Sequence, residues 1–119
     1  MKIFSTRFHG ALDYGTVIAL PSLFLWLGAG GETRRVADGG AAFVLAYSLL
    51  TRYEWGAAKV LPMPAHLALD ALLGAGLVAA AAAAGRPGGE TAAVRGSLLG
   101  LGLFSLFASV VTETGPGRD

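Results

Sequence analysis

Residues 8–14 read FHGALDY and residues 65–71 read AHLALDA, and in both stretches a histidine precedes an aspartate by four positions. Each stretch opens a long apolar segment, and in a helix a spacing of four places two side chains one turn apart on the same face. The two faces, His9 with Asp13 and His66 with Asp70, predict a duplicated helical unit whose halves meet at these four side chains.

The composition is that of a membrane protein rather than of a soluble domain. Of the 119 residues, 54% are hydrophobic and only 14% are charged, whereas soluble domains carry about a quarter charged residues. The net charge of +1 gives no electrostatic basis for a nucleic-acid partner. The absence of cysteine excludes thiolate metal sites and thiol catalysis. The expected partner is therefore the lipid bilayer.

Four apolar segments each approach the length that crosses a bilayer, about 20 residues. They run from about Gly10 to Gly28, Arg34 to Tyr53, Ala65 to Ala84 and Ala92 to Thr112. A cleaved signal peptide is a poorer interpretation of the first segment, because Asp13 interrupts its apolar run. We predict an all-α fold, an integral membrane four-helix bundle that forms a single domain over residues 1–119.

Further matches between the two halves predict a pair of parallel helical hairpins. The tetrapeptide GGET occurs at residues 30–33 and again at residues 88–91, and Gly39 matches Gly96 at nearly the same offset. These matches place repeat one at about residues 5–56 and repeat two at about residues 62–114. Both repeats then begin on the same side of the membrane.

Small and hydroxylated residues predict how the helices start and pack. Thr33 and Thr91 are expected to cap the second and fourth helices, because a threonine hydroxyl accepts a bond from an early backbone N–H. Gly96 and Gly100 form a GxxxG pair, which favours a close helix crossing. A homodimer is a further assembly that such small-residue faces allow.

The positions of the charged and aromatic residues predict how the chain is oriented in the membrane. The five basic residues on the side of the termini are Lys2, Arg7, Arg52, Lys59 and Arg118. The four on the other side are Arg34, Arg35, Arg86 and Arg95. This slight excess favours termini in the cytoplasm. The expected location is the bacterial inner membrane, with multiple spans. The aromatic residues Tyr14, Trp26, Tyr53 and Trp55 are expected to anchor at the membrane interfaces.

Polar residues gather in one membrane half. They are His9, Asp13, His66 and Asp70, with Arg52, Ser109, Thr112 and Glu113, and with Tyr47, Ser48 and Thr51 at the end of the second segment. An ionisable side chain inside a membrane costs a few kcal/mol at the bilayer centre, so the aspartates require partners. We therefore expect one polar nest beneath the surface on the side of the termini.

Three hypotheses for this nest remain open from the sequence. In the first, hydrogen bonds and an Arg52–aspartate pair only lock the two hairpins together. In the second, His9, Asp13, His66 and Asp70 ligate a metal ion or relay a proton. In the third, His9 and His66 hold a haem or another redox or catalytic metal. A serine hydrolase built on Ser48 or Ser109 lacks any supporting motif.

Two longer stretches carry a family resemblance. They are TRFHGALDYGTVIALPSLFLWLG at residues 6–28 and LLTRYEWGAAKVLPMPAHLALDALLGAGL at residues 49–77. They resemble small bacterial integral membrane proteins of the SPW-repeat family, although Pro21, Ser22 and Trp26 replace a contiguous SPW. The resemblance implies paired membrane hairpins and no known activity. The sequence favours a non-enzymatic protein that requires no cofactor, with a polar nest that stabilises the bundle and binds or relays a proton or cation.

Overall fold

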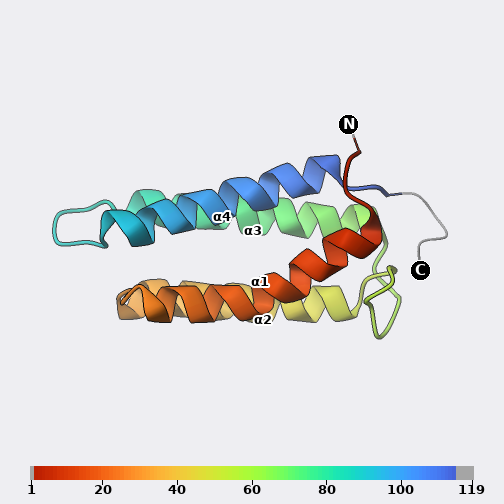
Figure 1. Cartoon of the computed structure of the whole chain (residues 1–119), viewed down its shortest axis with the longest axis horizontal. Coiled ribbons are helices and arrows are strands. Elements are labelled where there is room, and N and C mark those ends of the chain that lie inside the picture. Colours follow the sequence, from red (N-terminus) through yellow and green to blue (C-terminus); the bar gives the residue numbers. More distant parts are fainter. Residues whose placement is uncertain (1, 115–119) are drawn as a thin grey trace.

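The part of the chain that the structure describes folds into four long helices. The computed structural model describes residues 2–114, and its helices are α1 (Thr6–Trp26), α2 (Gly31–Leu49), α3 (Met63–Ala83) and α4 (Ala92–Val111). Figure 1 shows α1 antiparallel to α2 and α3 antiparallel to α4, with the two hairpins lying alongside each other and the start of α1 and the end of α4 at the same end of the bundle. Over residues 2–114, the prediction of an all-helical fold with four helices is confirmed.

The odd and even helices follow different repeat offsets. Helix α3 begins and ends 57 residues after α1, whereas α4 begins 61 residues after α2. The connection over residues 84–91 is twice as long as the connection over residues 27–30, which accounts for the difference. Thr112 is therefore the counterpart of Thr51, and the match of Gly39 with Gly96 does not reflect the register of the helices.

The helix starts differ in how they are capped. The Thr91 side chain accepts a hydrogen bond from the backbone N–H of Val94, as expected for the cap of α4. The expectation for Thr33 is wrong, because α2 already starts at Gly31 and Thr33 is buried within its first turn. The backbone N–H of Gly30 instead donates to the Glu90 carboxylate at 2.9 Å, which links the two connections at this end of the bundle.

At the other end, each repeat is tied to the start of its neighbour. An isolated parallel bridge joins Phe4 to Thr112, and a second joins Thr51 to Leu61. The two bridges obey the same offsets as the helices, so they are equivalent contacts of the two repeats. They bring the beginning of α1 to the end of α4, and the beginning of α3 to the end of α2.

The helices within the second hairpin cross closely at two glycines. A side-chain carbon added to Gly74 would lie 2.7 Å from the backbone oxygen of Gly102, and one added to Gly102 would lie 2.7 Å from the oxygen of Gly74. In contrast, nothing lies within 4 Å of such a carbon at Gly96 or Gly100. The close crossing that was predicted for the GxxxG pair is therefore made by other glycines of the same hairpin.

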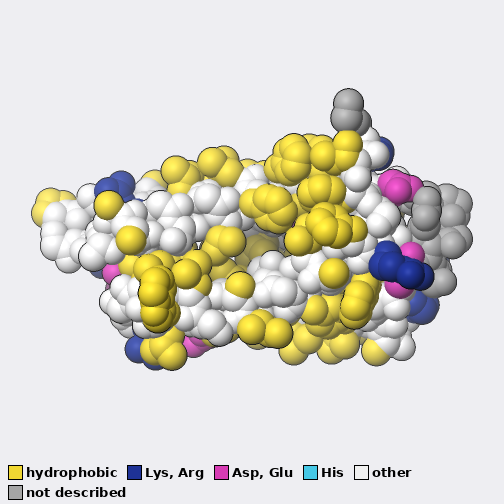
Figure 2. Space-filling model, viewed as in Figure 1, with side chains coloured by type: hydrophobic (Ala, Val, Ile, Leu, Met, Phe, Trp, Pro, Cys, Tyr) yellow, Lys and Arg dark blue, Asp and Glu magenta, His cyan; other side chains and the backbone are white. Residues whose placement is uncertain are grey.

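The outer surface is apolar along the helices and charged at the ends. Two helices, α3 and α4, are long and apolar enough to cross a membrane. Helices α1 and α2 have similar lengths but carry more polar and charged residues. Figure 2 shows hydrophobic side chains along the length of the molecule and most of the Lys, Arg, Asp and Glu side chains near its two ends. Arg118, which counted toward the predicted orientation, lies outside the described residues.

We predict that Gly74→Ala and Gly102→Ala each destabilise the protein, because an added methyl group must push two helix backbones apart. The expected cost is about 1–3 kcal/mol, as for other overpacked sites. Unfolding of the purified protein in detergent micelles measures it. Gly76→Ala and Gly100→Ala are matched controls on the same two helices, and their added carbons meet nothing within 4 Å. Equal stability of all four variants would contradict the assigned crossing.

Candidate functional site

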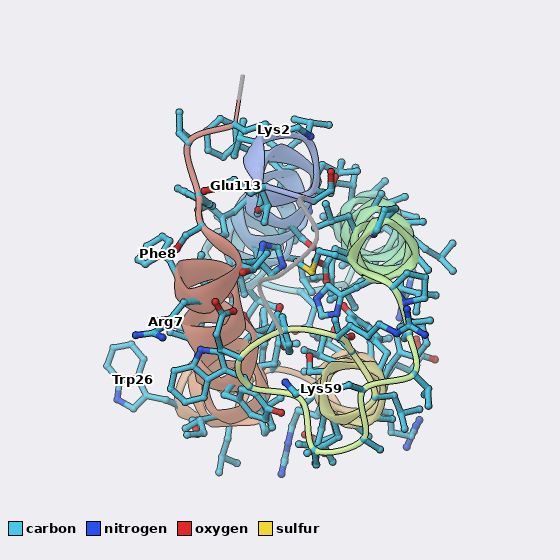
Figure 3. The ribbon with its side chains drawn as sticks, turned by 90° about the vertical axis from the view of Figure 1, so that its right-hand side faces the viewer. Lys2, Arg7, Phe8, Trp26, Lys59 and Glu113 are labelled. Atoms are coloured by element: carbon cyan, nitrogen blue, oxygen red, sulfur yellow. The ribbon has the colours of Figure 1, made fainter. Side chains whose placement is uncertain are left out.

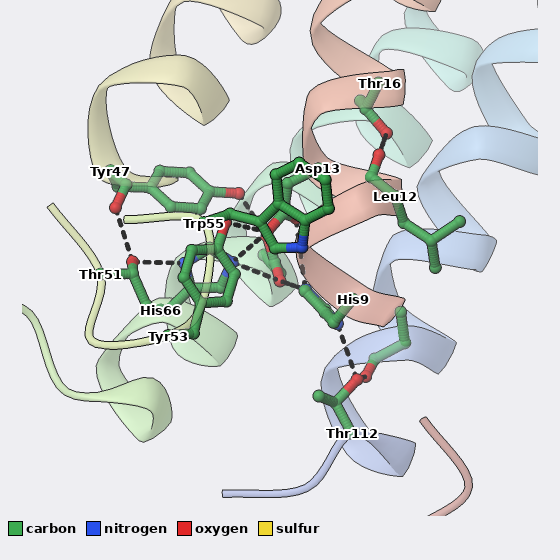
Figure 4. Close-up of polar contacts among 12 residues, drawn as sticks. His9, Leu12, Asp13, Thr16, Tyr47, Thr51, Tyr53, Trp55, His66 and Thr112 are labelled. Carbon is green, nitrogen blue, oxygen red and sulfur yellow. Dashed lines mark hydrogen bonds and ion pairs between the residues drawn. The ribbon is translucent and has the colours of Figure 1, made fainter. Parts of the chain in front are cut away.

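The four residues of the opening pattern converge in one buried cluster. His9 and Asp13 come from α1, and His66 and Asp70 from α3. Each offers a nitrogen or oxygen atom, and these four atoms all lie within 4.8 Å of one another. All four residues are buried, with exposed fractions of at most 5%. We refer to them as the His/Asp cluster, and Figure 4 shows how His9 and His66 approach it from opposite sides.

Each histidine contacts both aspartates through its Nε2 atom. Nε2 of His9 lies 2.6 Å from Oδ2 of Asp70 and 3.3 Å from Oδ1 of Asp13. Nε2 of His66 lies 3.0 Å from Oδ2 of Asp13 and 3.4 Å from Oδ2 of Asp70. The shortest contact joins residues of different hairpins. The cluster is thus a seam between the repeats and not two separate pairs within helices.

The Nδ1 atom of each histidine is held by a threonine of the other repeat. Nδ1 of His9 lies 2.7 Å from Oγ1 of Thr112, and Nδ1 of His66 lies 2.6 Å from Oγ1 of Thr51. Each threonine hydroxyl already donates to a carbonyl four residues earlier, in the helix that precedes it. Because a hydroxyl has a single hydrogen, each threonine oxygen accepts and each Nδ1–H donates. This fixes the orientation of both rings and directs both Nε2 atoms into the cluster.

Two tyrosine hydroxyls hold the carboxylates. The Tyr47 hydroxyl donates to Oδ1 of Asp70, and the Tyr53 hydroxyl donates to Oδ2 of Asp13 at 2.6 Å. Burial raises the pKa of Tyr53, and the charge and hydrogen bond of Asp13 raise it further. The hydroxyl therefore stays protonated and acts as a donor to the carboxylate.

One nitrogen in the cluster has no hydrogen bond. His66 is fully buried, yet its Nε2 makes no hydrogen bond with any described residue. Its 3.0 Å approach to Asp13 has the distance of an ion pair without the direction of a hydrogen bond. A buried polar atom without a partner is uncommon and calls for an explanation. Here the atom points at the common centre of the cluster.

The connection between α2 and α3 covers the cluster at the end of the bundle. The indole N–H of Trp55 donates to the carbonyl of Arg7 at 2.8 Å, and the Tyr14 hydroxyl donates to the carbonyl of Trp55. Gly10 allows this contact, because a side-chain carbon there would collide with the indole. This connection therefore packs against the first turns of α1, the helix that carries His9 and Asp13.

The other predicted site residues do not all lie at the cluster. Thr112 belongs to the site, as the partner of His9. The Ser109 hydroxyl donates to the carbonyl of Leu106 in its own helix. The exposed Arg52 side chain donates to the carbonyl of Lys59, so the predicted pair of Arg52 with an aspartate does not form. Glu113 follows α4 and is not among the acids that converge in the cluster; Figure 3 shows it at the end of the bundle facing the viewer.

Tyr53 is the site residue whose role the sequence did not indicate. It was expected to anchor at a membrane interface, but it is completely buried and bonded to Asp13. Tyr47 and Thr51 were expected in the same membrane half without assigned partners. The signal for Thr51 was available in principle, because Thr51 and Thr112 end the two even helices at equivalent positions.

Comparisons with family models, with curated proteins and with solved structures found no match to this chain. The SPW-repeat resemblance therefore stays an expectation from the quoted residues.

We predict that Thr51→Val and Thr112→Val each destabilise the protein, because the change removes the acceptor of a buried imidazole N–H. Leaving such a donor unpaired costs about 1–3 kcal/mol. Thr16→Val is the matched control, since the Thr16 hydroxyl donates only to the Leu12 carbonyl of its own helix. Chemical unfolding measures all three variants. If Thr51→Val loses no more stability than Thr16→Val, the assigned histidine–threonine bonds are wrong.

Proposed function

We propose that this protein is a small membrane protein whose His/Asp cluster binds one divalent transition-metal ion, of the Zn²⁺ class, at the seam between its two hairpins. The observation that carries the proposal is the convergence of two imidazole Nε2 atoms and two carboxylates within 4.8 Å. The role is non-enzymatic: the ion joins the repeats or is exchanged at this site.

The ligand set suits such an ion in number, chemistry and charge. Zn²⁺ prefers four nitrogen, sulfur or oxygen ligands in a tetrahedron, with bonds of about 2.0–2.2 Å to histidine and carboxylate. Binding of the ion displaces any proton on the Nε2 atoms, because a metal-binding nitrogen must be deprotonated. Two neutral imidazoles and two carboxylates then supply four ligands and a charge of −2, which balances a divalent cation. Ca²⁺ is a poorer fit, because it takes six to eight oxygen ligands.

The surroundings of the ligands support the same proposal. Histidines that bind metals almost always donate their second ring N–H to a neighbouring acceptor, which fixes the ring and its tautomer. His9 and His66 both do so, through Thr112 and Thr51. Tyr47 and Tyr53 hold the carboxylates in the same way. An ion at the centre also supplies the partner that Nε2 of His66 lacks.

A haem is a poor fit to these residues. The His9 and His66 rings lie 5.3 Å apart between their centroids and nearly perpendicular, at 78°. The carboxylates of Asp13 and Asp70 lie within 3.4 Å of the Nε2 atoms. A porphyrin plane between the two nitrogens would have to displace both carboxylates. The purely structural hypothesis is the outcome that remains if no metal binds.

The location in a membrane is part of the proposal. The support is the apolar character of α3 and α4, together with large hydrophobic side chains exposed on every helix. Examples are Ile18 on α1, Phe43 on α2, Leu72 on α3 and Leu103 on α4, which are 38–71% exposed. Helices that are apolar on their outer faces suit a lipid environment. We propose that α1 and α2 also cross the bilayer, paired with α3 and α4.

We predict that the purified protein binds one equivalent of Zn²⁺, and that Asp13→Asn, Asp70→Asn, His9→Ala or His66→Ala abolishes this binding. Losing a hydrogen-bond partner of a metal ligand typically costs about 10–100-fold in affinity, and losing a ligand should cost more. Titration calorimetry and elemental analysis measure the binding. Asp38→Asn is the control, because Asp38 is an exposed aspartate of α2.

The same preparations distinguish the alternatives. Zinc binding that is equal in the wild type and in the cluster variants would overturn the site. A Soret band in the visible spectrum would favour haem. Absence of metal from protein prepared without chelators, together with absence of binding in titrations, would leave the structural role alone.

We also predict that the two ends of the bundle lie on opposite sides of a membrane. Because the chain contains no cysteine, single cysteines report position without background. Ala58→Cys and Pro87→Cys, at exposed positions of the two end connections, should react with a membrane-impermeant maleimide from opposite faces of oriented vesicles. Leu72→Cys, at the exposed middle of α3, should be protected. Reaction of all three from one face would show that the chain does not span the bilayer.

A further inference from the structure

A cavity adjoins the His/Asp cluster in the space between the two hairpins. Its volume is about 40 Å³, and it is lined by His9, Asp13 and Asp70 and, farther along the bundle, by Leu20, Leu77 and Leu101. A single water requires about 10–15 Å³ measured in this way, so the cavity has room for about three waters. Phe104 also lines the cavity and is 43% exposed. The cavity therefore extends toward the surface, where Figure 2 shows a hollow between the hairpins.

The lining of the cavity breaks the symmetry between the two repeats. Val44 and Ser105 are counterparts and both line it, as do Asp13 and Asp70. One turn further along the even helices, Ala108 lines the cavity, whereas its counterpart Tyr47 does not. The phenol ring of Tyr47 fills on one side of the cluster the space that the methyl group of Ala108 leaves open on the other.

The hydrogen bonds of the two carboxylates show the same asymmetry. Both oxygens of Asp70 accept hydrogen bonds, Oδ1 from Tyr47 and Oδ2 from His9. For Asp13, Oδ2 accepts from Tyr53. Its Oδ1 has only Nε2 of His9 at 3.3 Å, an ion-pair contact rather than a hydrogen bond. Asp13 thus lines the cavity, and its Oδ1 accepts no hydrogen bond from a described residue.

We propose that this cavity binds a small hydroxyl-bearing molecule, a phenol or an alcohol, whose O–H donates to Asp13 as the Tyr47 hydroxyl donates to Asp70. The leucines accommodate the apolar body of the molecule. A cavity that encloses benzene is about 150 Å³, whereas this cavity is about 40 Å³, so the hydroxyl end enters it and a ring lies partly outside, beside the exposed Phe104. The proposal rests on Asp13 and on the repeat symmetry, and it does not require a bound metal ion.

Phenol and toluene are a matched pair of probes, because they have the same ring and differ in the hydroxyl. Thermal unfolding of the full chain in detergent micelles is measured with each, in the presence of a chelator. A ligand that binds only the folded state raises the melting temperature. We expect phenol to raise it by a few degrees, on the scale of about 1 kcal/mol for a domain of this size, and toluene to raise it less.

Variants at Ala108 decide whether the effect arises in this cavity. Ala108→Tyr supplies the ring and hydroxyl from within the chain, and Ala108→Leu fills the space without a hydroxyl, so both should lose the phenol response. If Ala108→Tyr does not fold, Ala108→Leu makes the same test. Val110→Tyr places a tyrosine on the exposed face of the same helix and should respond as the wild type does.

Two results would overturn the proposal. The first is an equal response to phenol and toluene, which shows that the hydroxyl plays no part. The second is an unchanged phenol response in the Ala108 variants, which places the effect in the micelle or elsewhere on the protein. Since a chelator is present throughout, neither result bears on metal binding, and failure of zinc to bind leaves this test intact.

Discussion

The interaction on which this structure depends is the mutual contact of two imidazoles and two carboxylates in a buried site. Each group alone would be costly to remove from water, and more so within a bilayer. Together they contact one another across α1 and α3, which belong to different hairpins. The cluster therefore determines how the hairpins meet, and the bridges of Phe4 with Thr112 and Thr51 with Leu61 fix the same end of the bundle.

The duplication accounts for the contacts of the site that both repeats share. The differences between the repeats account for the contacts that only one of them makes. Thr51 and Thr112 are equivalent and bind the histidine of the opposite repeat in the same way. The tyrosines are not equivalent in this sense, because Tyr47 and Tyr53 both belong to the first half of the chain. One side of the cluster is consequently closed by aromatic rings, while the Ala108 side contains a cavity.

Some glycines of the second hairpin lie at a close helix contact, and others face open space. Gly74 and Gly102 let two backbones approach within a distance that excludes any side chain, whereas Gly96 and Gly100 face open space. The sequence alone does not show which of these glycines meet, because α3 and α4 are both apolar and rich in small residues. Only the rotation of α4 about its axis decides which glycines meet α3.

The sequence by itself determined the elements and the core of the site. The four-residue spacing of His9 with Asp13 and of His66 with Asp70, within long apolar runs, predicted the helices and the faces that meet, because these are local properties of a helix. Only the tertiary structure decided the partners of each atom: Thr112 and Thr51 on the Nδ1 atoms, Tyr53 on Asp13, and the surface position of Arg52. These contacts join residues up to 103 positions apart, so they depend on helix rotation and on the path of the α2–α3 connection, which no local pattern encodes.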